Sequence, residues 1–290
     1  MSNGGPPNQK HDGRVGSEPL AADSSTPNMA RIYDYYLGGK GNYACDREVA
    51  RMVLGAAPDV PLAALENREF LKRAVEFLVC EAGISQFIDI GPGLPTQANV
   101  HALVRRHTPD APVVYVDNDP VVLSHGRALL QGADGVAVID GDIRTPGAIL
   151  SNPKLRELID LSRPVAVCMS LVLHFLPDSD DPRALVRSIR DSIRPGSYLV
   201  LTHVTGDART VDTMSEIRGI YDEATAPLVP RTKDEFTRFF EGFELVEPGV
   251  VFLSQWRPAT EYYARGGTQW AYAAVGRKVR ASRSLQAVPL

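Results

Sequence analysis

The sequence predicts an α/β protein built on a mostly parallel, doubly wound sheet. One observation is that short apolar runs alternate with segments of helical periodicity, as in successive β-α units. A second is the stretch 86–96, where an apolar run closed by Asp89 leads into a turn with Gly91 and Gly93. Such a turn marks the ligand-binding edge of a sheet, because glycine permits positive φ angles and lets a ligand approach the backbone.

Two more apolar runs end in acidic residues. Residues 113–116 precede Asp117, and residues 136–139 precede Asp140 and Asp142. Because the carboxyl ends of parallel strands meet at one edge, we expect these acids beside the glycine turn. The acid after the second strand of such a sheet faces the hydroxyls of a bound ribose, so the pattern predicts a nucleotide-like ligand.

Helix-start signals follow the predicted strands. Thr96 can cap the helix after the first strand, and proline at the first helical position follows Asp119, Thr145 and Asp181. Later in the chain, residues 232–235 form a capping box. These signals predict where five helices begin.

The last third of the chain changes pattern. Apolar runs predict two further parallel strands at 164–169 and 197–202, and a helix is expected over 207–224. The runs at 243–253 and 268–275 have no helical pattern between them. They predict an antiparallel hairpin at the sheet edge.

Helices are also expected before the sheet. Residues 1–28 have too little apolar content to fold and are expected to form a disordered tail, and 281–290 a flexible one. Apolar residues at helical spacing, followed by glycines, predict helices over 30–37, 46–54 and 62–81. They define a helical cap over 29–83, and the sheet domain is expected over 84–280.

Composition narrows the class of protein. The 290 residues, 44% hydrophobic and 23% charged, fit a soluble globular protein of one large or two modest domains. A net charge of −4 provides no basic field for nucleic acid. No apolar run approaches the roughly 20 residues of a membrane span, and no signal peptide is evident. We therefore expect a cytoplasmic protein without nucleic-acid or membrane partners.

The cysteines do not indicate a disulfide framework or a metal site. Cys45, Cys80 and Cys168 are odd in number, widely separated and without a CxxC spacing. The sequence predicts reduced, buried thiols and no bound metal.

The whole constellation resembles the Rossmann-like class I fold of S-adenosylmethionine-dependent methyltransferases, with a seven-stranded, mostly parallel sheet. More closely, residues 27–278 resemble a bacterial S-adenosyl methyltransferase family first catalogued as a domain of unknown function. The segments that carry this resemblance are 30–40, 86–91 with 94–96, 114–120 and 173–175. The resemblance implies S-adenosylmethionine as methyl donor and S-adenosylhomocysteine as product. It leaves the acceptor unspecified, and a small molecule is expected.

The resemblance also implies roles along the strand ends. Asp89, Gly91 and Gly93 would lie under the amino-acid end of the cofactor, and Asp117 would accept both ribose hydroxyls. The adenine and the methyl group would be bordered by further residues that follow strands two to four, namely Asn118, Asp142, Ile143, Ser170 and Leu171. Asp140 competes with Asp142 for the adenine amine, and Arg144 is expected to be a surface or ion-pair residue.

The first helix carries an unusual polar and aromatic cluster. The resemblance implies that this helix covers the cofactor through Arg31, Tyr33, Tyr36 and Gly38, with Asp34 or Arg31 holding its polar end. Tyr36 is also a catalytic candidate. A base is needed only for an acceptor that is protonated at neutral pH, and the candidates are His174 and His203, each of which follows a predicted strand. Either histidine could instead be structural.

Other parts of the chain have alternative interpretations. Trp256 is expected to fix the edge hairpin, whereas Tyr262 and Tyr263 could line an acceptor cleft. Pro95 stands where the broad methyltransferase pattern has glycine, and its fixed φ can alter the chain near the methionine part of the cofactor. The protein could also be a non-catalytic module that binds the cofactor. A nicotinamide-dependent oxidoreductase fits less well, because the third fingerprint glycine would fall at Thr96.

Overall fold

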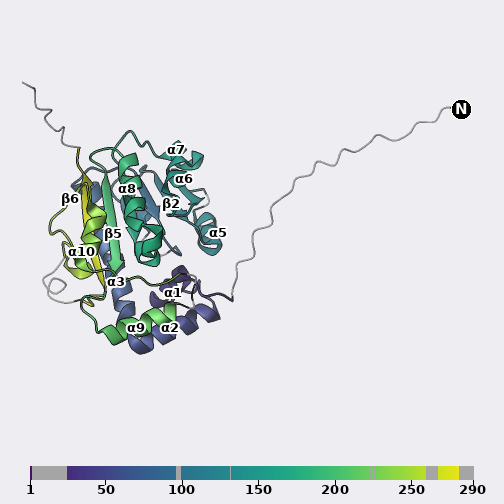
Figure 1. Ribbon diagram of the computed structural model, residues 1–290. Helices are drawn as coiled ribbons and strands as arrows, with labels where there is room; N and C mark the ends of the chain where they lie inside the picture. Colours follow the sequence, from purple (N-terminus) through teal and green to yellow (C-terminus); the bar gives the residue numbers. More distant parts are fainter. Residues whose placement is uncertain are drawn as a thin grey trace, which may run out of the picture.

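The computed structural model describes residues 1, 25–95, 99–130, 132–222, 224, 226–258 and 267–280. Its centre is one sheet in the order β3-β2-β1-β4-β5-β8-β6, with β7 also paired to β8 (Figure 1). The strands are β1 (Phe87–Ile90), β2 (Val113–Asp117), β3 (Val136–Asp140), β4 (Ala166–Ser170), β5 (Tyr198–Val204), β6 (Phe243–Leu245), β7 (Val251–Phe252) and β8 (Ala271–Lys278). Strands β1 to β5 are parallel, and β8 is antiparallel to its neighbours. The expected class I methyltransferase fold is confirmed.

Helices precede the first strand, separate the parallel strands from one another and follow the last of them. They are α1 (Met29–Tyr36), α2 (Ala44–Ala56), α3 (Val60–Cys80), α4 (Val100–Val104), α5 (Pro120–Leu129), α6 (Pro146–Ser151), α7 (Pro153–Leu158), α8 (Pro182–Ser192), α9 (Val211–Tyr221) and α10 (Lys233–Thr237). None of them is both long and apolar enough to cross a membrane.

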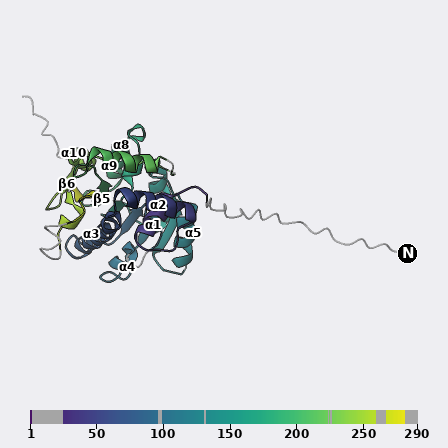
Figure 2. The same ribbon diagram turned by 90° about the horizontal axis from the view of Figure 1, so that it is seen from below.

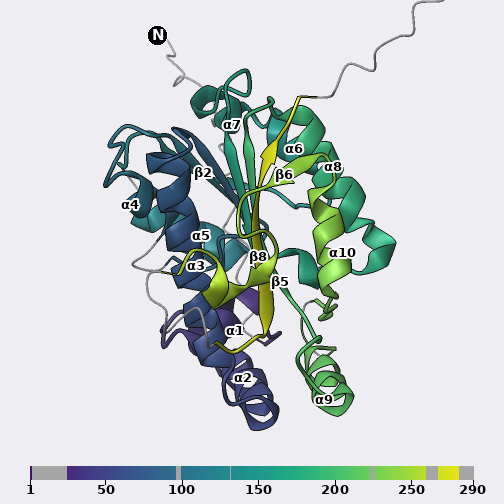
Figure 3. The same cartoon turned by 90° about the vertical axis from the view of Figure 1, so that its left-hand side faces the viewer.

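Two apolar layers hold helices on opposite faces of the sheet (Figure 3). Alternate residues of each strand face opposite sides, so Ile88 packs with α6, α7, α8 and α10, whereas Phe87 packs with α3 and α4. Trp256 lies in the second layer, fully buried, with its ring edge-on to Phe70. Arg73 of α3 donates to the Trp256 carbonyl at 2.8 Å. Trp256 is thus held against α3, and its role in fixing the edge hairpin stays a prediction.

A third apolar cluster joins α1, α2 and α9 at the carboxyl ends of the parallel strands (Figures 1 and 2). Ile32 of α1, Val53 of α2 and Ile217 of α9 are buried in it. Helices distant in sequence therefore cover one edge of the sheet together. These helices therefore lie over the carboxyl ends of the parallel strands.

The capping signals are mostly confirmed. The Asp119 carboxylate accepts from the Val121 amide at 2.6 Å, and Thr232 forms the predicted capping box. Thr145 was predicted to cap α6, but its hydroxyl instead donates to the Asp142 carbonyl at 3.0 Å. Thr96 lies outside the described residues, and α4 begins at Val100.

Two other expectations are corrected. The glycine at position 55 lies inside α2 and does not end it. Of the three cysteines expected to be buried, Cys168 is buried, Cys45 is half-buried and Cys80 is exposed. The division of the chain into a cap and a sheet domain stays a prediction, and most of both predicted tails lies outside the described residues.

Candidate active site

A cavity of about 430 Å³ lies between the carboxyl ends of β1 to β4 and the helices α1, α2, α3 and α9. It brings together twelve of the residues expected in the site. These are Tyr33, Tyr36, Asp89, Gly91, Gly93, Asp117, Asn118, Asp142, Ile143, Ser170, Leu171 and His174. Residues from four predicted strand ends and from the first helix thus converge as the sequence predicted.

The glycine turn forms the floor of the cavity. Gly91 has φ 70° and Gly93 has φ 66°, angles that glycine adopts without steric cost. A Cβ atom on Gly91 would lie 2.5 Å from the Cγ2 atom of Val172, which also lines the cavity. A larger residue at position 91 would therefore push a wall of the site.

Two buried carboxyl groups face this turn. Burial raises the pKa of Asp89 to about 7, with the Asp117 carboxyl adding to the rise and the Arg68 guanidinium opposing it. Burial also raises the pKa of Asp117 to about 6, against the hydrogen bonds it accepts from the Asp119 and Gly93 amides at 3.0 and 3.4 Å. Both groups are thus poorly compensated acceptors, suited to a ligand that brings donors or positive charge.

The ends of β2 and β3 form a polar rim. Asn118 donates to the Asp142 carboxylate at 3.2 Å, and Ile143 is buried beside them. Asp142 lines the cavity, but its rival Asp140 does not and is exposed. Arg144 forms the expected ion pair, with Asp142 at 3.3 Å.

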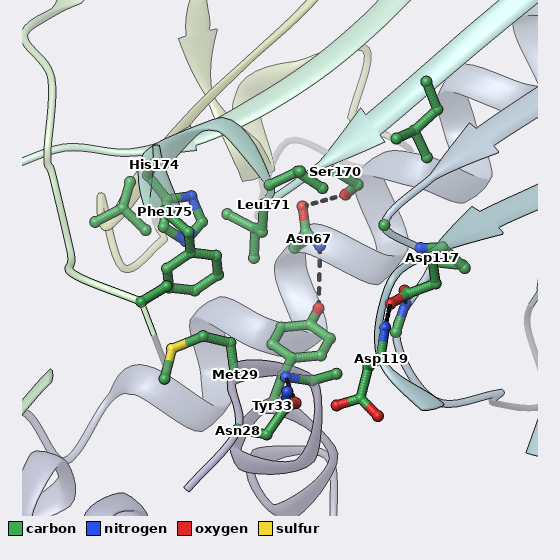
Figure 4. A pocket seen from close by; sticks show the side chains of 18 of the residues that line it. Asn28, Met29, Tyr33, Asn67, Asp117, Asp119, Ser170, Leu171, His174 and Phe175 are labelled. Carbon is green, nitrogen blue, oxygen red and sulfur yellow. Dashed lines mark hydrogen bonds between the residues drawn. The ribbon is translucent and has the colours of Figure 1, made fainter. Parts of the chain in front are cut away.

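One asparagine joins the cap to the sheet. Asn67 of α3 donates to the Tyr33 hydroxyl at 3.0 Å and accepts from Ser170 at 3.0 Å and Thr202 at 2.8 Å (Figure 4). The Thr202 hydroxyl also accepts from the Leu171 amide, and Leu171 has the unusual φ of 56°. The network fixes Tyr33 and the chain after β4 against each other in the middle of the cavity.

Asn67 and its neighbour Arg68 were missed from the sequence. Arg68 lines the cavity with its guanidinium 5.3 Å from the centre of the Tyr33 ring, and its Nε atom is buried with no hydrogen-bond partner. The signal was a polar residue on an apolar helix face. Position 67 follows Ala64 by three residues and precedes Phe70 by three, yet it holds an amide.

The opposite side of the cavity is aromatic and apolar. His174 and Phe175 lie there, across from Asp117 and Asp119, with Leu171 and Asn67 between the two sides (Figure 4). The hydroxyls of Tyr36 and Tyr221, both buried, are 3.3 Å apart. Burial raises the pKa of Tyr221 and raises that of Tyr36 far above its ordinary value, so both phenols are neutral.

Several expected site residues lie outside the cavity lining. Arg31 forms a buried ion pair with Asp46 at 2.8 Å, and Asp34 accepts from the Gly41 amide, so both hold the cap together. Gly38 ends α1 with φ 74°. His203 lies behind the wall, paired with a backbone carbonyl and with Arg231. The pair Tyr262 and Tyr263 lies outside the described residues.

These groups fit S-adenosylmethionine. The buried carboxyls offer acceptors for ribose hydroxyls and an ammonium group, and the unpaired Nε atom of Arg68 offers a donor for a carboxylate. A sheet of this order with such a cavity at its glycine turn defines a class I methyltransferase. The sequence pattern of the S-adenosyl methyltransferase family matches residues 16–279, so the chain belongs to that family and is an S-adenosylmethionine-dependent methyltransferase.

Two solved structures resemble the chain over nearly all of their length. A DUF574 family protein from Streptomyces avermitilis is 38% identical, with a TM-score of 0.83 over 88% of this chain and 99% of its own. A protein from Thermobifida fusca, described as a candidate methyltransferase, is 40% identical, with a TM-score of 0.85 over 91% and 100%. None of the curated proteins matches. The family defines the methyl donor and leaves the acceptor open.

Proposed function

We propose that this methyltransferase binds its methyl donor on the carboxylate side of the cavity and methylates a small molecule bound on the aromatic side. The observation that carries the proposal is the contrast between the two sides of one cavity (Figure 4). A cavity of about 430 Å³ between the sheet edge and a helical cap suits small reactants. A macromolecular acceptor would need a more open surface.

Each group on the carboxylate side has a role in this proposal. Asp117 accepts the ribose hydroxyls through its two carboxylate oxygens, and Asn118, Asp142 and Ile143 border the adenine. Gly91 and Gly93 lie under the amino-acid end. Asp89 accepts from the cofactor's ammonium group.

Arg68 completes the amino-acid end of the donor site. Its unpaired Nε atom would donate to the carboxylate of the methionine part, and Tyr33 beneath the guanidinium holds it in place through a cation-π contact. The opposite charges of Asp89 and Arg68 then match the ammonium and carboxylate groups of an amino acid. This pairing gives the donor one orientation.

The chain's contribution to catalysis is mainly alignment. S-adenosylmethionine carries its methyl group on a positively charged sulfur and supplies the electrophile when bound. The cap helices cover the ends of the strands, and Leu171 and Tyr33 lie between the two sides, where an acceptor can be held in line with the methyl group. Orientation of this kind can supply much of a rate enhancement.

Replacement of Asp117 by alanine tests the donor site. The Asp117→Ala variant should bind S-adenosylhomocysteine about tenfold or more weakly by calorimetry, the scale of one or two charge-assisted hydrogen bonds. Asp140→Ala is the matched control, because Asp140 is the register partner of Asp117 on β3 but is exposed outside the cavity. Equal affinities of the two variants would overturn the ribose assignment.

Two expectations that rest on composition stay predictions. They are a cytoplasmic location and the lack of a nucleic-acid partner. The Asp117 experiment does not depend on either.

A further inference from the structure

We propose that the acceptor is a neutral, aromatic or otherwise flat apolar molecule with a hydroxyl group, and that His174 is the catalytic residue that receives the hydroxyl proton. This inference rests on the proposed function and names the substrate class of the same cavity. It assigns to one histidine a task that the sequence left open between two.

The charge distribution excludes a charged acceptor. The described lining has six charged residues, all on α3 or at the ends of β1 to β3, namely Arg68, Asp89, Asp117, Asp119, Asp142 and Arg144. Among the described residues that line the aromatic side, none is an acid that could stabilise an ammonium group, and the Arg231 guanidinium is already paired with Asp178 at 2.7 Å. Burying an unpaired charge there would be strongly unfavourable, as it is for any isolated ion in an apolar site.

The wall of the aromatic side favours a flat molecule. Phe175, Tyr36, Tyr221 and Trp270 contribute rings, and aliphatic side chains fill the spaces between them, namely Met29, Val53, Val60, Ile217 and Leu228. Aromatic faces and edges pack well against another ring and make little use of a polar chain. The same cavity also holds the methyl donor, so the acceptor is small.

His174 is the unsatisfied polar group on this side. Its side chain is 3% exposed and lines the cavity, and its Nδ1 atom is buried with no hydrogen-bond partner. An unpaired buried polar group is unfavourable, and a hydrogen bond from an acceptor hydroxyl would relieve this. Burial, with His203 and Arg231 nearby, holds the pKa of His174 well below its ordinary value, so the imidazole is neutral and one ring nitrogen can accept a hydrogen bond from a hydroxyl group.

His203 is not available for the same task. Its Nδ1 atom donates to the Val204 carbonyl at 2.7 Å, and its Nε2 atom accepts from the Arg231 guanidinium at 3.0 Å. Both ring nitrogens are therefore used within the protein. The structure selects His174 from the two candidates.

Atoms and charge balance when the methyl group is transferred to a hydroxyl with His174 as the base. The acceptor oxygen forms a bond to the methyl carbon, the bond from that carbon to the sulfonium sulfur breaks with its electron pair left on sulfur, and the hydroxyl proton passes to His174. The positive charge leaves sulfur with the proton, which His174 passes on to solvent without holding it, because an imidazolium would be as unfavourable beside this apolar wall as any other unpaired charge. The products are a methyl ether and S-adenosylhomocysteine.

Binding of matched probes tests the substrate class. Calorimetry on the protein saturated with S-adenosylhomocysteine would compare naphthol, naphthoate and naphthylmethylamine, which differ in charge on one ring system. We expect naphthol to bind at least about tenfold more tightly than either charged probe, the scale of one retained hydrogen bond and one avoided buried charge. Preference for a charged probe, or binding of none of the three, would overturn the inference.

Two substitutions test His174 itself. His174→Phe should bind naphthol about tenfold more weakly while keeping its affinity for S-adenosylhomocysteine, and His174→Gln should keep part of the naphthol affinity. Methyl transfer to naphthol, followed by mass spectrometry, should fall about 100-fold or more in both variants. Unchanged naphthol affinity in His174→Phe contradicts the role. Failure of the wild-type protein to bind S-adenosylhomocysteine would instead defeat the proposed function.

Discussion

At the scale of residues, the site is defined by two carboxyl groups that the fold keeps from water. Asp89 is 4% exposed and Asp117 is 8% exposed, and both have raised pKa values of about 7 and about 6. Acids at strand ends are usually solvated, so their burial here must be offset by something that the protein binds. Ribose hydroxyls and an ammonium group would do this.

The affinity for the cofactor should depend on pH. We expect binding of S-adenosylhomocysteine to strengthen from about pH 5 to about pH 8, as Asp117 and then Asp89 lose their protons and become full acceptors. Stability of the free protein should change in the opposite direction. Folding raises the pKa values of these two carboxyls. Their stabilising contribution to the free energy of unfolding is therefore present below about pH 4 and is lost as the pH rises through about 6 and 7.

Calorimetric titrations across this range measure the first effect, and chemical unfolding measures the second. Asp117→Asn provides the control, because it removes the ionisation near pH 6 but keeps the side-chain shape. An affinity independent of pH in the wild-type protein would contradict the assignment of both carboxyls.

A comparison of alanine substitutions at Gly91 and Gly83 distinguishes the cost of backbone strain from the cost of steric overlap. Both have positive φ, 70° and 68°, but a Cβ atom on Gly83 meets nothing within 4 Å, whereas one on Gly91 meets Val172. Gly83→Ala should cost about 1–2 kcal/mol of unfolding free energy from the left-handed backbone alone. Gly91→Ala should cost at least about 1 kcal/mol more and weaken S-adenosylhomocysteine binding, because Val172 moves into the cavity. Urea unfolding of the two variants makes the comparison, and equal losses would show that the contact at Gly91 is unimportant.

At the scale of elements, α3 is the part that connects the cap to the sheet. Its apolar face packs on the sheet through Phe70 and Leu78, while Asn67 bonds to the ends of β4 and β5 and to Tyr33 of α1. The glutamate at position 66 also accepts from the Thr268 amide before β8. One helix therefore positions strand ends and cap helices together.

Asn67→Ala should disturb stability and binding together. Loss of its three hydrogen bonds removes one partner from each of three hydroxyls and should lower the unfolding free energy by about 2–3 kcal/mol. S-adenosylhomocysteine should also bind more weakly, because Tyr33 and Leu171 are no longer held. The matched control is Asn152→Ala, which removes the cap of α7 far from the cavity and should cost about 1 kcal/mol without changing affinity. If both variants bind equally well, the network does not position the site.

Most elements could be predicted from the sequence because their signals are local. Proline after Asp119 and the capping box at Thr232 define helix starts by hydrogen bonds to the next few residues. Thr145 has the same local signal but forms a different bond, since the turn at Asp142 competes for its hydroxyl. The insertion of β8 between β5 and β6 depends on pairing between distant segments, which periodicity alone does not specify.

At the scale of the whole molecule, one cavity results from three separate regions of the chain. The strand ends supply charged groups, α1 to α3 supply Tyr33, Asn67 and Arg68, and the region around α9 supplies Tyr221. The strand-end residues could be predicted because parallel strands end together at one edge. Arg68 and Tyr221 could not, because their place in the site depends on how helices fold back over that edge, and for Asn67 the sequence offered only a polar residue on an apolar helix face. The sequence thus indicated the donor side better than the acceptor side.

The most direct test of the account is a calorimetric titration of the wild-type protein with S-adenosylmethionine, S-adenosylhomocysteine and a nicotinamide dinucleotide in parallel. The account predicts binding of the first two in the micromolar range, typical of enzymes and their substrates, and no binding of the third. Failure to bind the first two, or preference for the dinucleotide, would contradict the claim that this cavity is a methyl-donor site.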